Sequence, residues 1–208
     1  MSFNIKKILI ATTNPGKVIE IKNMLSDEIE LMNLNDFTNI SEIEEDGNTF
    51  EENARKKALG YAKITGCWTI ADDSGLVIDA LSGAPGVNSA RFSGEKLKNE
   101  DRTLIDHRNI EKVLELLKNV PVEKRTARFV CCLCLANPEK IHIETKGILN
   151  GIITEEEIGK NGFGYDPIFF VPFLKKTVAQ LNQLEKNSIS HRGKAIKELI
   201  IKLSDYIQ

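Results

Sequence analysis

The sequence predicts a mixed α/β fold, in which helices pack on a central mixed sheet. Strand-like and helix-like segments alternate over the first part of the chain, whereas adjacent strand pairs follow later. No internal repeat, low-complexity stretch or linker divides the 208 residues. A chain of this length can bury a sizeable core, so we predict one domain over residues 1–208.

The first predicted elements are a strand, a loop and two helices. Residues 6–13, KKILIATT, form a short apolar run that is typical of a buried strand. Apolar residues then recur at helical spacing over 18–25, and Pro15 suits the start of that helix. Thr49 and Glu52 form a capping box for a second helix, which runs to about Gly66. Its predicted inner face consists of Phe50, Ala54, Ala58 and Tyr61.

The later elements follow from turn signals and periodicity. Residues 67–81 predict a strand, an acidic turn and a second strand, and residues 83–94 form a loop rich in Gly and Pro. The remaining predictions are a helix over 109–120, strands over 128–136 and 141–149, a glycine-rich loop over 159–167, a short helix near 178–184 and a longer helix from Ser190 to the end.

Composition excludes several classes of protein. Hydrophobic residues make up 41% and charged residues 28%, which is typical of a soluble globular protein. The net charge of −2 gives no global reason to bind nucleic acid or membranes. The N-terminus lacks the apolar region and cleavage site of a signal peptide, and no stretch approaches about 18 apolar residues. We therefore predict a cytoplasmic protein.

Three of the four cysteines lie in one predicted strand, FVCCLCLA. Strand alternation sends Cys131 to one face and Cys132 and Cys134 to the other. Cys131 and Cys134 match C-x-x-C, but no second ligand pair is spaced for zinc. A redox pair is the alternative, and both faces are apolar, so we interpret these cysteines as buried small hydrophobes.

ATTNPGK, residues 11–17, lies where the first strand meets the first helix. The first turn of a helix offers unpaired N–H groups and the positive end of its dipole, which suits an anion. Thr12, Thr13, Asn14 and Lys17 could therefore hold a polyphosphate; the simpler interpretation is a helix cap and a surface lysine. The G-x-x-x-x-G-K-[ST] pattern of kinases and GTPases does not occur.

Two acidic stretches could serve a metal. ADDSG, residues 71–75, places two carboxylates side by side, and each raises the other's pKa unless a cation offsets the charge. Mg²⁺ bound to phosphates takes one or two protein carboxylates. IEEDG, residues 43–47, could supply another ligand. The alternatives are an Asp-rich turn and a solvated acidic loop.

Two further stretches could bind a base. Phe163 and Tyr165 in GFGYDP have flat faces on which a base can stack, or they belong to a structural turn. Ser190 is a good N-cap, which puts His191 and Arg192 in the first turn of the last helix. Cations there oppose the helix dipole, so we interpret these two residues as contacts for another group, such as an anion or a purine edge.

Together these stretches describe nucleoside triphosphate chemistry, and they resemble one family. TNPGK, EEDGNTFEENA, ADDSGL, GAPGVNSARFSG, GFGYDPIF and SHRGKA occur in the order found in the inosine triphosphate pyrophosphatase family. The resemblance spans about Ile8 to Leu203, although the stretch between Lys96 and Arg128 carries no motif. It implies an elongated central mixed sheet flanked by helices, with two lobes and an active-site cleft between them. It also implies a homodimer, Mg²⁺, and hydrolysis of ITP, dITP and XTP to the monophosphate and pyrophosphate.

The resemblance assigns roles to residues of each motif. Asp73 would be the catalytic base, and Glu45 with Asp73 would hold the metal. The substrate-binding residues would be Thr12, Thr13, Asn14, Pro15, Gly16, Lys17, Lys57, Ser74, Phe163, Gly164, Tyr165, Asp166, Lys186, His191 and Arg192. From the residues alone, the base could be either Asp72 or Asp73.

Specificity follows from hydrogen bonding. A donor such as Arg192 aimed at position 6 favours the oxo group of hypoxanthine and xanthine and is opposed by the amino group of adenine. The alternatives are a pyrophosphatase for another modified or pyrimidine nucleotide, and a nucleotide sensor without catalysis. Because a sensor needs no paired carboxylates, Glu45 and Asp72-Asp73 favour an enzyme.

Overall fold

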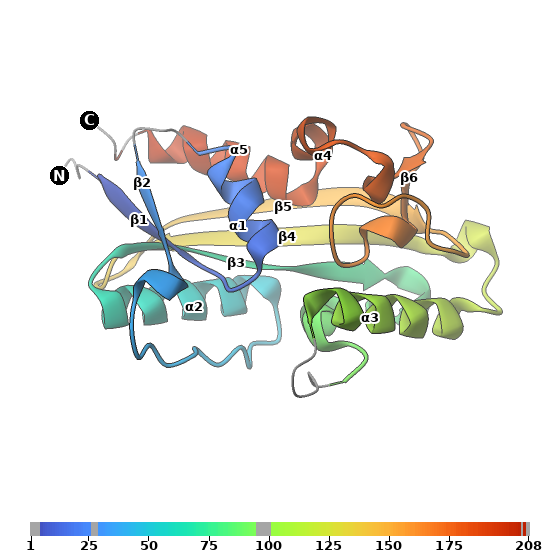
Figure 1. Ribbon diagram of the computed structural model, residues 1–208, viewed down its shortest axis with the longest axis horizontal. Helices are drawn as coiled ribbons and strands as arrows, with labels where there is room; N and C mark the ends of the chain where they lie inside the picture. Colours follow the sequence, from blue (N-terminus) through green and yellow to red (C-terminus); the bar gives the residue numbers. More distant parts are fainter. Residues whose placement is uncertain (1–4, 26–28, 95–100, 205, 207–208) are drawn as a thin grey trace. The chain divides into compact units, whose positions relative to one another are not determined.

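The computed structural model describes residues 5–25, 29–94, 101–204 and 206 (Figure 1). Its strands are β1 (Lys7–Ala11), β2 (Glu30–Asn33), β3 (Trp68–Ile78), β4 (Thr126–Ala136), β5 (Ile141–Ile153), β6 (Phe169–Val171) and β7 (Lys176–Thr177). Its α-helices are α1 (Pro15–Lys22), α2 (Phe50–Thr65), α3 (Arg102–Leu117), α4 (Gln183–Ile189) and α5 (His191–Leu203).

The strands are hydrogen-bonded in the order β2-β1-β3-β4-β5-β6-β7. β1 pairs in parallel with β2 and β3, whereas β6 pairs antiparallel with β5 and β7. Parallel pairing in the early strands and antiparallel pairing in the late ones confirm the predicted mixed sheet flanked by helices. Within the described residues, no helix combines the length and apolar character needed to cross a membrane.

The chain forms two compact units that are interleaved in sequence. Unit 1 comprises Met1–Asp73, Cys131–Gly147 and His191–Gln208, and unit 2 comprises Ser74–Val130 and Ile148–Ser190. The prediction of a single domain over residues 1–208 is not tested by this division and stays a prediction.

Unit 1 is built on both faces of its strands. Its main core is formed by apolar side chains of β1, β4 and β5 with those of α1 and α5, and Ile10, Ile21, Leu133 and Leu199 are fully buried members. The helix α2 lies on the other side of these strands (Figure 1). Its predicted inner face is confirmed, because Phe50, Ala54, Ala58 and Tyr61 are all buried.

Unit 2 has its own core under α3. Ile110, Val113 and Leu117 recur at helical spacing on α3 and join apolar residues of β3, β4, β5 and β6. Phe129 and Phe169 stack there with ring centroids 4.2 Å apart. The predicted helix over 109–120 is thus confirmed but begins earlier, at Arg102, where Asp101 caps it.

Other boundaries also differ from the predictions. Thr49 caps α2 as predicted, but the Glu52 carboxylate accepts from the Asn48 N–H instead of that of Thr49. Gly66 ends α2 with a φ of 72°, in the left-handed region that favours glycine. The single helix predicted near 178–184 is wrong, because Val178–Gln180 forms a short 3-10 turn and α4 begins only at Gln183. The last helix, α5, begins at His191 and ends at Leu203.

The largest correction concerns residues 67–81. The predicted acidic turn does not exist, because β3 runs without interruption from Trp68 to Ile78 and includes Asp72 and Asp73. Aspartate is rare in strands, but its tertiary surroundings can override that preference. Here Lys17 and Arg192 lie beside the Asp72 carboxylate, and Lys57 lies beside that of Asp73.

Candidate functional site

The loop before α1 satisfies its own helix terminus. The Asn14 side chain caps α1, and its Oδ1 accepts from the Gly16 N–H at 2.9 Å and the Lys17 N–H at 3.4 Å. Thr12 Oγ1 accepts from the Asn14 N–H, and Thr13 is exposed. The two amides expected to be unpaired are therefore paired with asparagine, which is among the best N-caps. The cationic side chain of this loop, Lys17, lies beside the Asp72 carboxylate.

Asp72 is surrounded by buried cations. Its side chain is fully buried, its Oδ1 lies 2.5 Å from Lys17 Nζ, and its Oδ2 accepts from Arg192 Nε at 2.7 Å. The Cys131 thiol also donates to this carboxylate. Burial alone would raise the pKa of Asp72, but the Arg192 guanidinium and the Lys17 ammonium hold it well below its usual range. Asp72 therefore stays ionised and is a poor proton acceptor.

Asp73, the next residue, has the opposite electrostatics. Asn53 Nδ2 donates to its Oδ2 at 3.2 Å, and Lys57 Nζ lies 3.6 Å from its Oδ1. Burial raises the pKa of Asp73 above its usual value, and the neighbouring Glu45 raises it further, against the opposing effect of Lys57. A carboxylate with a raised pKa is suited to accept a proton near neutral pH.

Lys57 connects the two acidic stretches. Its ammonium donates to the main-chain oxygen of Asp72 at 2.8 Å and lies 3.2 Å from Glu45 Oε2. The predicted metal ligands Glu45 and Asp73 therefore meet around one cation. Among the described residues, no three His, Cys, Asp or Glu side chains form a group that could hold a metal. Two carboxylates nevertheless fit Mg²⁺, which takes its remaining ligands from phosphates and water.

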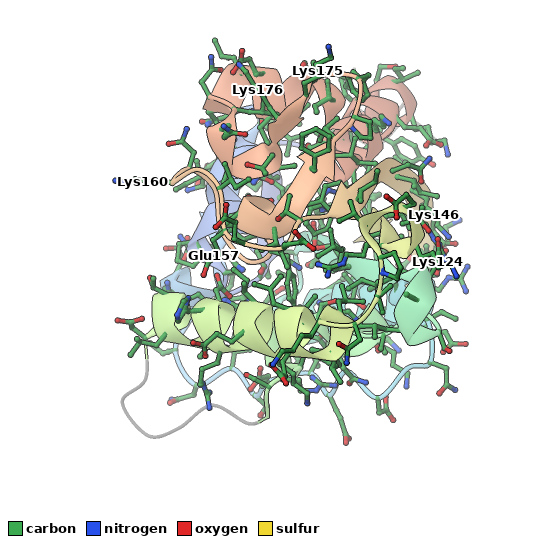
Figure 2. All side chains as sticks on the ribbon, turned by 90° about the vertical axis from the view of Figure 1, so that its right-hand side faces the viewer. Lys124, Lys146, Glu157, Lys160, Lys175 and Lys176 are labelled. Carbon is green, nitrogen blue, oxygen red and sulfur yellow. The ribbon has the colours of Figure 1, made fainter. Side chains whose placement is uncertain are left out.

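Burial separates the predicted site lysines from ordinary surface lysines. The side chains of Lys17, Lys57 and Lys186 expose only 14%, 8% and 5% of their surface. By contrast, Lys160, Lys175 and Lys176 of unit 2 are exposed and project outward (Figure 2). Because a buried ammonium is costly without a partner, the three buried lysines each sit beside a carboxylate.

The glycine-rich loop of unit 2 and the helix α4 bring together three predicted site residues. Asp166 Oδ2 accepts from the Phe163 N–H at 2.9 Å and from Lys186 Nζ at 2.6 Å. Lys186 Nζ also lies 4.4 Å from the centroid of the Phe163 ring. Gly162 has a φ of 80°, and a Cβ there would lie 2.0 Å from Asp166 Oδ2. The chain thus needs glycine at 162 so that the loop can close on its carboxylate.

The other predicted residues of unit 2 are placed as follows. Tyr165 is buried and its hydroxyl donates to the Ser89 main-chain oxygen at 2.8 Å. Tyr165 is therefore occupied in packing, as the structural interpretation of this loop expects. Ser74 is half-buried and follows Asp73 along β3.

Arg192 lies among carboxylates of unit 1. It is 2% exposed, and besides Asp72 it binds Glu20, whose Oε2 lies 2.5 Å from Arg192 Nη1. The sequence predicted that an anion or a purine offsets the cation that opens α5 against the helix dipole, and these two carboxylates are such anions. His191 is also buried, and a Cβ at Gly147 would lie 1.9 Å from its main-chain oxygen, so β5 approaches the start of α5 closely.

Sequence reasoning missed two residues of this network. Glu20 is 2% exposed and sits one turn after Lys17 on α1, and its spacing gives no signal of burial. Asn53 Oδ1 accepts from the Gly47 N–H at 2.8 Å while its amide nitrogen binds Asp73, so it joins the acidic loop to β3. A polar residue beside the apolar face of an amphipathic helix was the available signal for Asn53.

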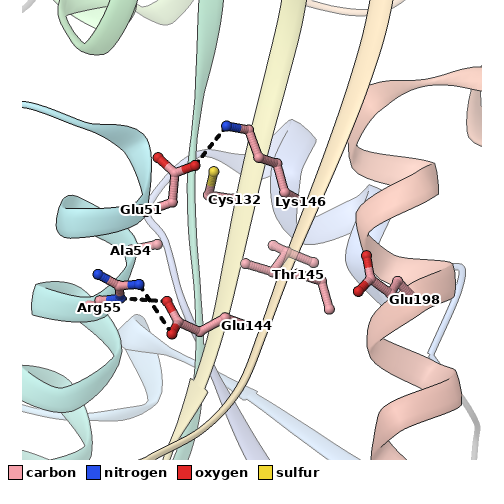
Figure 3. Close-up of a pocket in the computed structure, with 9 residues that line it drawn as sticks. Glu51, Ala54, Arg55, Cys132, Glu144, Thr145, Lys146 and Glu198 are labelled. Carbon is pink, nitrogen blue, oxygen red and sulfur yellow. Dashed lines mark hydrogen bonds and ion pairs between the residues drawn. The ribbon is translucent and has the colours of Figure 1, made fainter.

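A separate pocket of about 280 Å³ opens in unit 1 beside α2, β4, β5 and α5 (Figure 3). Two ion pairs line it, one between Glu51 and Lys146 and one between Arg55 and Glu144. The buried thiol of Cys132 also lines it. None of the predicted site residues is among the lining residues, so this pocket is distinct from the candidate site.

All three cysteines of β4 are buried and reduced, which confirms their interpretation as small apolar residues. Burial raises the pKa of Cys132 and of Cys134 to about 12. The thiols are therefore protonated near neutral pH and are unsuited to redox chemistry or metal binding.

Comparison with known proteins places the chain in a defined group. A model of the Ham1 family matches residues 8–202. A protein of Bacillus cereus named dITP/XTP pyrophosphatase is 47% identical over 206 residues, which cover 98% of this chain and 97% of the relative. A protein of the same name from Desulforamulus reducens is 48% identical over 194 residues, which cover 92% of each chain.

Solved structures agree with this placement. The Ham1 protein of Staphylococcus aureus has a TM-score of 0.83 at 42% identity, with 96% of this chain and 98% of that chain covered. A nucleoside-triphosphatase, dITP/XTP pyrophosphatase, of Mycobacterium abscessus has a TM-score of 0.74 at 41% identity, with 93% and 98% covered. These matches confirm both the mixed α/β fold and the family resemblance that the motifs indicated.

Proposed function

Because this chain belongs to the Ham1 family, we propose that it hydrolyses dITP, XTP and ITP to the nucleoside monophosphate and pyrophosphate. The names of its relatives support this activity. The observation that carries the proposal is the contrast between two adjacent carboxylates. Asp72 is held ionised by Lys17 and Arg192, whereas the pKa of Asp73 is raised by burial. Neighbouring groups with separated pKa values are typical of assigned acid–base roles.

In the proposed mechanism, Asp73 takes a proton from the water that attacks the α-phosphorus. Asn53 and Lys57 each contact one oxygen of Asp73 and so fix its orientation. Lys17 and Lys57 would stabilise the negative charge that develops as pyrophosphate leaves. The other residues of the phosphate loop, Thr12 to Gly16, would shape the site around the triphosphate.

Glu45 and Asp73 would hold Mg²⁺, which when bound polarises the phosphates and neutralises charge. The donor set supports this assignment, because the two carboxylates around Lys57 suit a hard divalent ion. A metal dependence measured with Mg²⁺ and with EDTA tests it.

In unit 2, the residues proposed to contact the base are Phe163 to Asp166 and Lys186, and Ser74 would contact substrate. In unit 1, His191 and Arg192 are proposed to bind substrate. The best support for the base contacts is local, because Lys186, Asp166 and the Phe163 ring contact one another. A ring face beside a cation and a carboxylate offers stacking and hydrogen bonding to a purine. An enzyme that recognises the 6-oxo group and hydrolyses these nucleotides would remove damaged purines from the nucleotide pool. The proposal includes a cytoplasmic homodimer, which light scattering in solution and cell fractionation test.

The test is a pyrophosphate-release assay on ITP, XTP, dITP, GTP, ATP and UTP, with Mg²⁺ and with EDTA. We expect rapid Mg²⁺-dependent release from dITP, XTP and ITP, with ATP disfavoured by about 10⁴-fold or more. Binding of ITP without turnover of any nucleotide would replace the enzyme with a sensor. Faster turnover of UTP than of ITP would keep the phosphate chemistry and refute the proposed base contacts.

The variant Asp73→Asn tests the catalytic base. We expect kcat to fall by about 10²- to 10⁴-fold, the usual contribution of a general base. Because the base must be ionised, wild-type kcat/KM should decline as the pH falls and Asp73 becomes protonated. The exposed Asp36→Asn is the matched control and should leave turnover unchanged. Near wild-type turnover of Asp73→Asn with Mg²⁺ present would remove Asp73 from the mechanism.

A further inference from the structure

The helix α3 carries no residue of the predicted site, yet one of its carboxylates contacts the glycine-rich loop. Asp106 Oδ2 accepts from the Gly164 N–H at 2.8 Å. Asp106 is 9% exposed, although aspartate is rarely buried without a reason. Its other oxygen, Oδ1, lies 2.9 Å from Arg102 Nε one turn earlier on α3, which leaves Oδ2 for the loop.

The Gly164 amide stands at the centre of the loop. Phe163 precedes it and Tyr165 follows it, and Gly164 itself has a φ of 60°. Glycine enters this region freely but leaves it as freely, so its conformation must be fixed by contacts. A hydrogen bond to a carboxylate is about twice as strong as one between neutral groups.

Two carboxylates thus bind successive amides of this loop. Asp166 accepts from the Phe163 N–H, and Asp106 accepts from the Gly164 N–H. Asp166 belongs to the loop itself and moves with it, whereas Asp106 lies on a helix whose apolar face is packed in the core of unit 2. Asp106 is therefore the anchor that ties the loop to a rigid element.

We propose that Asp106 is a positioning residue for the base, which fixes the backbone at Gly164 and thereby sets the Phe163 ring and the Asp166 carboxylate against the purine. This inference rests on the proposed function. It adds a residue from the stretch between Lys96 and Arg128, which carries no motif. Because Asp106 acts on the base and not on the phosphates, its loss should weaken base-dependent binding and spare the chemical step.

The experiment compares wild type, Asp106→Ala and Asp106→Asn in turnover of dITP and in inhibition by inorganic tripolyphosphate, which has no base. We expect Asp106→Ala to raise KM for dITP by about 10-fold or more, the effect of one hydrogen bond to a charged group. The value of kcat and the inhibition constant of tripolyphosphate should change by less than about 3-fold. Asp106→Asn keeps an acceptor oxygen and should recover most of the affinity for dITP.

Hydrogen exchange in the ligand-free protein adds a readout that needs no activity. The peptide that contains residues 162–166 should exchange faster in Asp106→Ala than in wild type, and Asp106→Asn should restore much of the protection. Glu115→Gln, which removes an exposed carboxylate from the same helix, is the matched control and should change neither KM nor exchange.

Each outcome bears on one claim. If wild type hydrolyses dITP and Asp106→Ala leaves KM unchanged, the inference is overturned while the proposed function stands. Equal rises in the KM for dITP and in the tripolyphosphate constant would overturn it too, because the effect would be general to the site. If wild type hydrolyses none of the nucleotides, the proposed function fails and the inference fails with it.

Discussion

Replacing Asp72 by Asn should destabilise the protein strongly, because its carboxylate neutralises two cations inside unit 1. Its side chain has no exposed surface, and the side chains of Arg192 and Lys17 expose 2% and 14%. Breaking a buried pair by removing one partner costs about 3–5 kcal/mol, since the remaining charge is left uncompensated. Arg192 keeps Glu20, so most of this cost falls on Lys17 and on the second bond of Arg192.

The assay is urea unfolding monitored by the fluorescence of Trp68, the chain's single tryptophan, which lies in unit 1 with Asp72. Glu30→Gln is the matched control, because Glu30 forms an exposed pair with Lys7 in the same unit and should cost about 0–1 kcal/mol. A loss of less than about 1 kcal/mol for Asp72→Asn would refute the view that this carboxylate compensates buried charge.

The pH dependence of Asp72→Asn gives an independent check. Arg192 and Lys17 hold the pKa of the buried Asp72 well below its unfolded value of about 4. Its stabilising contribution is therefore fully present above about pH 4 and is lost as the pH falls through the folded pKa. The variant lacks this group, so its unfolding free energy should fall less steeply than that of wild type on acidification. Parallel curves would contradict the assignment.

Two further predictions concern the glycine-rich loop and the cysteines. Gly162→Ala should lower the free energy of unfolding by about 1–3 kcal/mol more than Gly164→Ala. Both variants share the strain of a positive φ, but only Gly162→Ala places a Cβ against Asp166. Thermal melts of the two variants test this, and equal losses would contradict it. An alkylating reagent at about pH 8 should leave Cys132 and Cys134 unmodified in the folded protein and label both in urea, because burial raises their pKa to about 12. Mass spectrometry of tryptic peptides checks this, and labelling of the folded protein would show that the thiols are accessible as thiolates.

The sequence predicted the elements whose signals are local. The alternation of strands and helices, the Thr49 cap and the apolar face of α2 depend on residues within a few positions of one another, and the structure confirms them. The resemblance to a family was likewise carried by contiguous motifs, which the Ham1 family match confirms.

The errors have their cause in contacts between residues far apart in the chain. Asp72 and Asp73 were predicted in a turn because aspartate disfavours strands, but Arg192 lies 120 positions away from Asp72 and neutralises it. The partners of Arg192 were hidden for the same reason, because Asp72 and Glu20 lie far from it in the chain. Its role in binding substrate stays a prediction. The choice between Asp72 and Asp73 as base depended on these partners, so no spacing rule could have made it.

The interleaving of the two units has a consequence for biosynthesis. Unit 1 draws on three separate stretches of chain, and the core beneath β1 includes Ile196 and Leu199 of α5. A nascent chain that has emerged only as far as β5 lacks α5, so the apolar face that packs on α5 is exposed. Asp72 and Glu20 then also lack their contact with Arg192. Contacts between residues far apart in the chain form slowly, and apolar surface that can aggregate stays exposed while translation continues. The core of unit 1 is therefore complete only after α5 has been synthesised.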